Sequence, residues 1–176
     1  MITYELAILL GVILLIAYII YAIILKRSIK RIIVNCIFIA YLIGVAIVTL
    51  FPIVYDDPVE YTDIITWYNF IPFKTISSAF HNGITATAVT QIIGNIIMSV
   101  PFGVIVLMLF NIPQWWKKLL IALSFTASIE LIQMLIGMAI GNMYRNIDID
   151  DIILNLLGVI IGYGIYAIIP QKIKQL

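Results

Sequence analysis

The chain has 176 residues, of which 64% are hydrophobic and 11% are charged, and its formal net charge is +1. A soluble domain is about 45–50% apolar and about 25% charged, so this composition excludes a water-soluble globular protein and indicates an integral membrane protein. Because the basic residues are divided among short loops, the net charge gives no indication of nucleic-acid binding, and no nucleic-acid partner is expected. The single Cys36 excludes an internal disulfide and a cysteine-based metal cage.

Five apolar segments are long enough to cross a bilayer, which takes about 20 helical residues. They are Ile2–Leu25, Ile32–Val54, Thr87–Phe110, Leu119–Ile140 and Ile152–Ile169. We therefore expect an all-α polytopic membrane protein, a bundle of five transmembrane helices. Its expected parts are two N-terminal helices in residues 1–54, an extracytoplasmic aromatic loop in residues 55–86 and a three-helix core in residues 87–176.

The loop between the second and third expected spans is the longest connection. Its middle, "WYNFIPFKTISSAFHNG", is aromatic and moderately apolar, but it is too short to span and is interrupted by Pro72. Such a segment is typical of an interfacial or re-entrant piece that lies on the outer leaflet. The run Asp56-Asp57-Pro58 predicts a turn after the second span, and the single His81 is expected to be a solvated loop residue.

Lysine and arginine predict the orientation. Eight of these residues follow the first, third and fifth spans, and they are Lys26, Arg27, Lys30, Arg31, Lys117, Lys118, Lys172 and Lys174. Only Lys74 and Arg145 fall on the opposite side. Cytoplasmic loops carry the excess of positive charge. The N-terminus is therefore expected outside, and the C-terminus in the cytoplasm.

The fourth span contains Glu130, the one acidic residue expected well inside the membrane. A charged group at the bilayer centre costs roughly 2.5–3.5 kcal/mol, so Glu130 should face the bundle and be paired or protonated. Helical spacing places it on one stripe with Thr126, Gln133, Gly137 and Gly141. A functional role for Glu130 is the first interpretation, and a buried carboxyl paired with Gln133 and a neighbouring helix is the structural alternative.

The fifth and third spans carry matching stripes, which are Asp151-Asn155-Gly158-Gly162 and Gln91-Asn95-Ser99. A Gly-xxx-Gly pair in an apolar helix predicts close helix packing. The simplest arrangement packs the third, fourth and fifth spans around a polar cavity open to the outside. Asn95 and Asn155 would bind a ligand there or serve as hydrogen bonds between helices.

The segment "RNIDIDD" lies at the expected rim of that cavity. Asp148 is a candidate cap for the start of the fifth span, where acids are favourable. Asp150 and Asp151 would hold Arg145, a cation or a polar head group. The three aspartates are weak metal candidates because the glycine and distal glutamate of a calcium loop are missing. Arg145 would alternatively bind an anionic head group through its planar fork.

Four segments in order resemble the VanZ-like family of membrane proteins. "RNIDIDDIILNLLGVIIGY" resembles its C-terminal signature, and the other matching segments are "NFIPF" (Asn69–Phe73), "GNIIMSVPFG" (Gly94–Gly103) and "SIELIQ" (Ser128–Gln133). Ser99 stands where an aromatic or aliphatic residue is common in the family. The resemblance covers about residues 65–166. It implies a link to resistance against lipidated glycopeptides such as teicoplanin, but it supplies no reaction.

Three functions remain open at this point. The protein binds a membrane lipid or a lipidated glycopeptide through Asn95, Gln133, Arg145, Asp148, Asp150, Asp151 and Asn155. Alternatively, it is an enzyme acting on a lipid-linked cell-wall component, with Glu130 as general acid and base. A lipid transporter or flippase is the third possibility, and because the five spans show no duplicated halves, it would need a homo-oligomer. No cofactor is expected.

Overall fold

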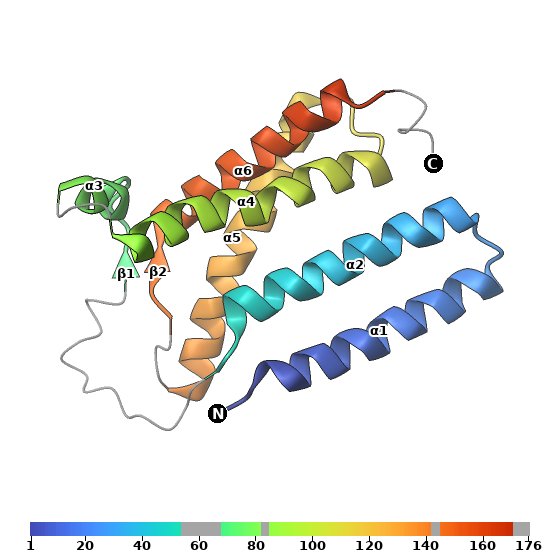
Figure 1. The fold of residues 1–176 in the computed structure, drawn as a ribbon, viewed down its shortest axis with the longest axis horizontal. Coiled ribbons are helices and arrows are strands. Elements are labelled where there is room, and N and C mark those ends of the chain that lie inside the picture. The colour runs from blue at the N-terminus through green and yellow to red at the C-terminus, as the bar shows by residue number, and fades with distance from the viewer. Residues whose placement is uncertain (54–67, 82–84, 142–144, 171–176) are drawn as a thin grey trace.

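The computed structural model describes residues 1–53, 68–81, 85–141 and 145–170 (Figure 1). In chain order its elements are α1 (Tyr4–Ile24), α2 (Ile29–Leu50), β1 (Tyr68–Asn69), α3 (Lys74–His81), α4 (Ala86–Leu109), α5 (Trp115–Ile140), β2 (Ile147–Asp148) and α6 (Ile149–Ile168). Five of these helices are long and apolar enough to cross a membrane. The expected helical bundle with five spans is confirmed.

The helix boundaries differ from the expected spans by a few residues, most at the end of α2 and the start of α5. α2 ends at Leu50 because Pro52 follows it, and a proline cannot continue a helix. α5 begins at Trp115, so the tryptophan pair and Lys117 lie in its first turn and not in the preceding loop. The hydropathy pattern leaves this first turn out of the helix because lysine counts as polar. The long stem of a lysine can nevertheless lie along an apolar surface while its charge stays in water.

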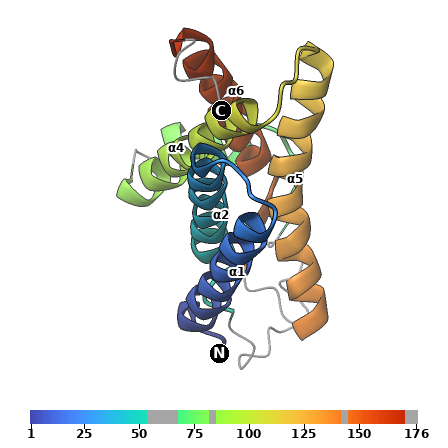
Figure 2. The ribbon, with the colours of Figure 1, turned by 90° about the vertical axis from the view of Figure 1, so that its right-hand side faces the viewer.

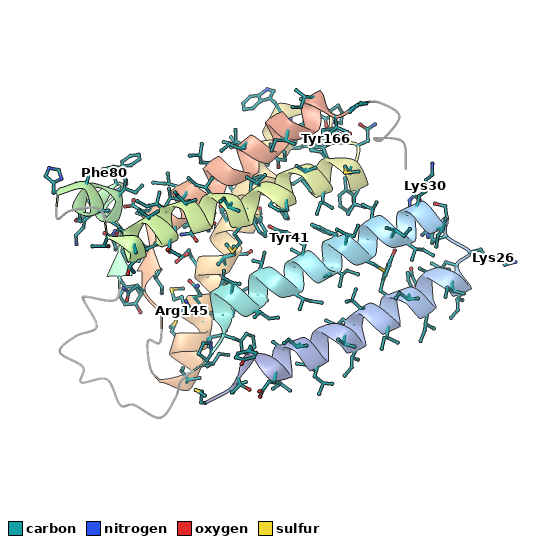
Figure 3. All side chains as sticks on the ribbon, in the orientation of Figure 1. Lys26, Lys30, Tyr41, Phe80, Arg145 and Tyr166 are labelled. Carbon is teal, nitrogen blue, oxygen red and sulfur yellow. The ribbon has the colours of Figure 1, made fainter. Side chains whose placement is uncertain are left out.

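The long helices share two ends. In Figure 1 the starts of α1, α4 and α6 and the ends of α2 and α5 lie on the side of the molecule that carries β1, β2 and α3. We call this side the α3 end. The end of α6 and the turn between α1 and α2 lie at the opposite end, where Figure 3 places Lys26 and Lys30. α3 does not cross the bundle, and His81 is its last residue instead of a loop residue.

α4 and α6 run parallel and make the most extensive helix contact in the described structure. A Cβ atom built on Gly103 would lie 2.2 Å from the carbonyl oxygen of Val159, and one on Gly158 would lie 2.2 Å from that of Ile96. Gly162 is equally close to the carbonyl oxygen of Val100. The predicted close packing of the fifth span is confirmed, because only glycine lets the two backbones touch in this way.

The remaining helices pack around this pair. α5 contacts α6, α2 contacts α4 and α5, and α1 packs mainly on α2. Figure 2 shows α1 and α2 together, with α5 standing beside them. The buried core includes Phe102, Val106 and Val159, and the Phe102 ring stacks on Phe125 with centroids 3.8 Å apart. Many apolar side chains of α1 and α2 are exposed, as expected for helix faces in contact with lipid.

Candidate functional site

The α3 end contains a cluster of polar side chains that begins at the first turn of α6. Asp148 is the N-cap of α6, and its carboxylate accepts a hydrogen bond of 2.9 Å from the backbone N–H of Asp150. The predicted cap is therefore confirmed. β1 and β2 pair in parallel, with Asn69 opposite Asp148. The Asn69 side-chain amide donates to Asp148 at 2.9 Å, and the Thr75 hydroxyl donates to the same carboxylate.

Asp150 is completely buried and holds the start of α3. Its carboxylate accepts hydrogen bonds from the backbone N–H groups of Phe73 (2.5 Å), Thr75 (2.8 Å) and Ile76 (3.1 Å). A helix start leaves such N–H groups without partners in its own helix, and a negative charge there is favourable. Phe73 has a left-handed backbone with φ of 64°, which is costly for a residue with a side chain. Asp150 stabilises this conformation through the Phe73 N–H.

The polar stripes of α4 and α6 face each other directly. The Asn95 amide donates to Asp151 at 2.6 Å, and one turn further the Ser99 hydroxyl donates to Asn155 at 2.8 Å. Gln91 reaches Asp151 at 3.4 Å. Ser99 is completely buried and Asn155 nearly so. Ser99 and Asn155 therefore pair with each other inside the bundle, where water is not available to do so, whereas Gln91 is exposed at the end of the stripe.

Glu130 joins α5 to the same cluster. It is 5% exposed, and its Oε2 accepts a hydrogen bond of 3.2 Å from the backbone N–H of Asp148. Of its predicted stripe, Thr126, Gln133 and Gly137 are also buried. Gly141 instead ends α5 with φ of 68° and has open space around it, so it provides a helix end and not a helix contact.

Gln133 and Arg145 both bind the C-terminal end of α2. The Gln133 amide donates to the Thr49 carbonyl oxygen at 2.9 Å. Arg145 donates to the carbonyl oxygens of Phe51 (2.9 Å) and Val48 (3.3 Å). These are carbonyl groups that a helix end leaves without partners, and a cation is favourable beside them. The sequence predicted that Arg145 contacts Asp150 and Asp151. Its described hydrogen bonds go instead to the carbonyl oxygens of Val48 and Phe51.

Replacing Arg145 with alanine should therefore loosen α2. We expect a loss of about 1–3 kcal/mol of unfolding free energy, because the Phe51 and Val48 carbonyl groups lose a charged donor. Arg145→Lys should recover part of this loss, since lysine keeps the charge but has a single donor group. Unfolding in mixed micelles measures the effect. Equal stability of Arg145→Ala and the wild type would contradict this role.

A hollow of about 220 Å³ lies between α3 and the first turns of α4. Its lining residues are Thr75, Ser78, Ala79, Thr85, Ala88, Gln91 and Ile92. Two of them connect it to the polar cluster, because Thr75 is bonded to Asp148 and Asp150, and Gln91 to Asp151. The described segment before and within α3 also exposes Phe70, Phe73 and Phe80, and Figure 3 shows Phe80 on α3.

Asn69, Thr75 and Ser99 are parts of the cluster that were not predicted as site residues. Asn69 lies in the "NFIPF" segment and Ser99 in a polar stripe, so the sequence contains a signal for each. Thr75 has no such signal, because its role depends on a contact across 73 residues of chain. Asp56, Asp57 and Pro58, the expected turn, lie outside the described residues.

The cluster is acidic, but the carboxylates of Asp148 and Asp150 already accept hydrogen bonds from the protein itself. Within residues 1–53, 68–81, 85–141 and 145–170, no group of three or more His, Cys, Asp or Glu side chains is arranged to hold a metal ion. The oxygens of Asp148 and Asp150 accept from amide, hydroxyl and backbone N–H donors of the protein itself. The arrangement positions α3 and the hollow beside it.

Comparison with protein families gives one match over most of the chain. The family model described as VanZ/LLP1 matches residues 38–170. This range includes α4, α5 and α6 and every residue of the polar cluster, and it leaves out α1. No curated protein and no solved structure matches the chain.

Proposed function

The chain belongs to the VanZ/LLP1 family, and from this premise we propose that it binds a lipid-linked or lipidated amphiphile at the outer face of a bacterial cytoplasmic membrane. Binding there would lower susceptibility to teicoplanin-type lipoglycopeptides. The protein is membrane-embedded with five spanning helices.

The orientation in this proposal places the α3 end outside. Lys26 and Lys30 lie at the opposite end in Figure 3, and Trp115, Lys117 and Lys118 are at the start of α5. Positive charge accumulates on the cytoplasmic side of membrane proteins. The N-terminus is then outside, and the C-terminus is cytoplasmic.

The observation that carries the proposal is a mainly apolar hollow with some polar groups, formed in part by the same segment that exposes three aromatic side chains. Phe70, Phe73 and Phe80 are 66%, 58% and 65% exposed, and the hollow between α3 and α4 is lined partly by hydroxyl and amide groups. An amphiphile needs both surfaces, since its acyl chain remains in an apolar environment while its head group forms hydrogen bonds. The short helix α3 would lie at the level of the lipid head groups.

The predicted site residues then act mainly by positioning this hollow. Asp148 and Asp150 hold α3 through Thr75, and Asp151 with Asn95 holds Gln91 at the hollow. Asn155 fixes α6 against α4 through Ser99. Gln133 and Arg145 keep α2 in place.

The test is expression in a teicoplanin-sensitive Gram-positive host at matched membrane levels. We expect the wild type to raise the minimal inhibitory concentration of teicoplanin but not that of vancomycin, which lacks the lipid tail. Ala88→Leu should abolish this protection because its side chain fills the hollow. Ala86→Leu is the matched control, since it adds the same side chain to the exposed face of the same helix.

Wild-type protein that protects against neither antibiotic would contradict the resistance function. Protection that survives Ala88→Leu would show that the hollow takes no part in the resistance function. Glu130→Gln separates binding from catalysis. Its amide oxygen can still accept the hydrogen bond from Asp148, so a binding protein should keep its activity, whereas an enzyme with Glu130 as general acid and base should lose it.

A further inference from the structure

We propose, on the basis of the amphiphile-binding function above, that the hollow between α3 and α4 accepts an uncharged head group rich in hydroxyls and discriminates against phosphate. The chemical class is a sugar carried on a lipid.

The lining of the hollow contains hydrogen-bonding groups without formal charge. Its polar members are Thr75, Ser78, Thr85 and Gln91, and the other lining side chains are alanine and isoleucine. A phosphate group is recognised by arginine, lysine or several converging N–H donors. Among the described residues that line the hollow, none is cationic.

The free hydrogen-bonding capacity of the lining includes both donors and acceptors. Thr85 accepts from the Ala88 N–H at 3.1 Å, which leaves its own hydroxyl proton to donate. Gln91 uses one N–H on Asp151, and its carbonyl oxygen and second N–H have no partner in the described part of the chain. A sugar hydroxyl both donates and accepts, whereas a phosphate oxygen accepts only. Mixed groups of this kind therefore suit hydroxyls.

The charge behind the hollow is negative. Thr75 contacts the carboxylates of Asp148 and Asp150, and Gln91 contacts that of Asp151. An anionic head group placed against Thr75 and Gln91 would thus lie one side chain away from three carboxyl groups. Like charges at this separation repel each other strongly in a partly buried site.

The lining includes neither Arg145 nor Lys74, the arginine and the lysine of the α3 end within the described residues. Arg145 donates to the carbonyl oxygens of Val48 and Phe51 at the end of α2. Lys74 begins α3, but its exposed side chain is not part of the lining. Consequently, no described side chain in the lining of the hollow offsets the negative charge of the carboxyl groups behind it.

Binding of lipids that share one pair of acyl chains tests this inference. The full-length protein in micelles is offered glucosyl-diacylglycerol, phosphatidylglycerol and a trimethylammonium lipid, and occupancy is measured by native mass spectrometry. We expect the glucosyl lipid to bind at least about tenfold more tightly than phosphatidylglycerol. Ala88→Leu should remove this preference, and Ala86→Leu should retain it.

Ser78→Lys is the second variant, because it places a cation in the lining without changing the aspartate contacts. It should raise the affinity for phosphatidylglycerol relative to the glucosyl lipid. Addition of teicoplanin separates the two sources of a sugar. Displacement of the glucosyl lipid supports a hollow shared with the antibiotic, and retention supports a membrane glycolipid as the ligand.

Two results would overturn the head-group chemistry and leave the proposed function in place. One is binding of phosphatidylglycerol at least as tight as that of the glucosyl lipid, with the same sensitivity to Ala88→Leu. The other is a preference for the trimethylammonium lipid, which would mean selection by charge. If Ala88→Leu affects none of these lipids and does not affect teicoplanin, both the head-group chemistry and the proposed binding function fail.

Discussion

Replacing Asp150 with alanine is expected to detach α3 from the bundle and to remove protection against teicoplanin. The carboxylate of Asp150 is completely buried, and it accepts three hydrogen bonds from the backbone of Phe73, Thr75 and Ile76. Its loss leaves three backbone N–H groups without their acceptor. We expect a loss of about 3–5 kcal/mol, the range for removing one partner of a buried charged interaction.

The conformation of Phe73 adds to this effect. Its left-handed backbone, with φ of 64°, is stabilised by the hydrogen bond to Asp150. Once this bond is lost, Phe73 can relax to an ordinary conformation and α3 loses its fixed start. A cysteine introduced at Ser78 should then react faster with a water-soluble maleimide, in a background where Cys36 is replaced.

Two controls make this experiment specific. Asp150→Asn keeps one carbonyl oxygen as an acceptor and should have a smaller effect than alanine. Glu5→Ala removes an exposed acid at the same end of the bundle, whose carboxylate accepts a hydrogen bond from the Thr3 hydroxyl. If Asp150→Ala unfolds at the same point as Glu5→Ala and labels at the wild-type rate, Asp150 does not hold α3.

Adding a single methyl group at Gly158 is expected to force α4 and α6 apart. The new Cβ would lie 2.2 Å from the carbonyl oxygen of Ile96 and 2.9 Å from the Cβ of Ser99. Backbone atoms cannot move aside without shifting a helix, so we expect a cost of about 3 kcal/mol, at the upper end of overpacking effects. The shift should also weaken the hydrogen bond between Ser99 and Asn155 one turn away.

Gly164 offers a matched control on the same helix. A Cβ built there meets nothing within 4 Å, so Gly164→Ala should be neutral or should stabilise α6 by up to about 1 kcal/mol. Unfolding by titration with a denaturing detergent compares the two variants directly. Equal stability of Gly158→Ala and Gly164→Ala would show that α4 and α6 do not touch at Gly158.

The cap at Asp148 and the close packing at Gly158 were accessible from local patterns. A cap depends on residues a few positions apart, and the glycine spacing of a helix repeats every turn. Both features can therefore be predicted from residues that are close together in the sequence. The partner of Arg145 was not accessible in this way. Its neighbours in the sequence are aspartates, but its hydrogen bonds go to carbonyl oxygens nearly one hundred residues earlier.

The polar stripes illustrate the same limit. Helical periodicity placed Asn95 and Ser99 on one face of a helix and Asp151 and Asn155 on one face of another. It did not say that these faces meet in register, so that each pair forms a direct hydrogen bond. It also did not show how Asp150 binds the segment before α3, because that contact spans 77 residues for Phe73.

Composition and short-range periodicity are enough to predict a membrane protein with five spanning helices and to predict which helix faces carry polar groups. The reason is that the bilayer requires about 20 apolar residues per helix and penalises every unpaired polar group. The pairing of the polar groups, the contacts of Arg145 and Gln133 with α2, and the hollow between α3 and α4 come from the three-dimensional packing. These features depend on the relative position and register of the helices. The same apolar faces could pair in several ways, and the glycine contacts and buried hydrogen bonds select one of them.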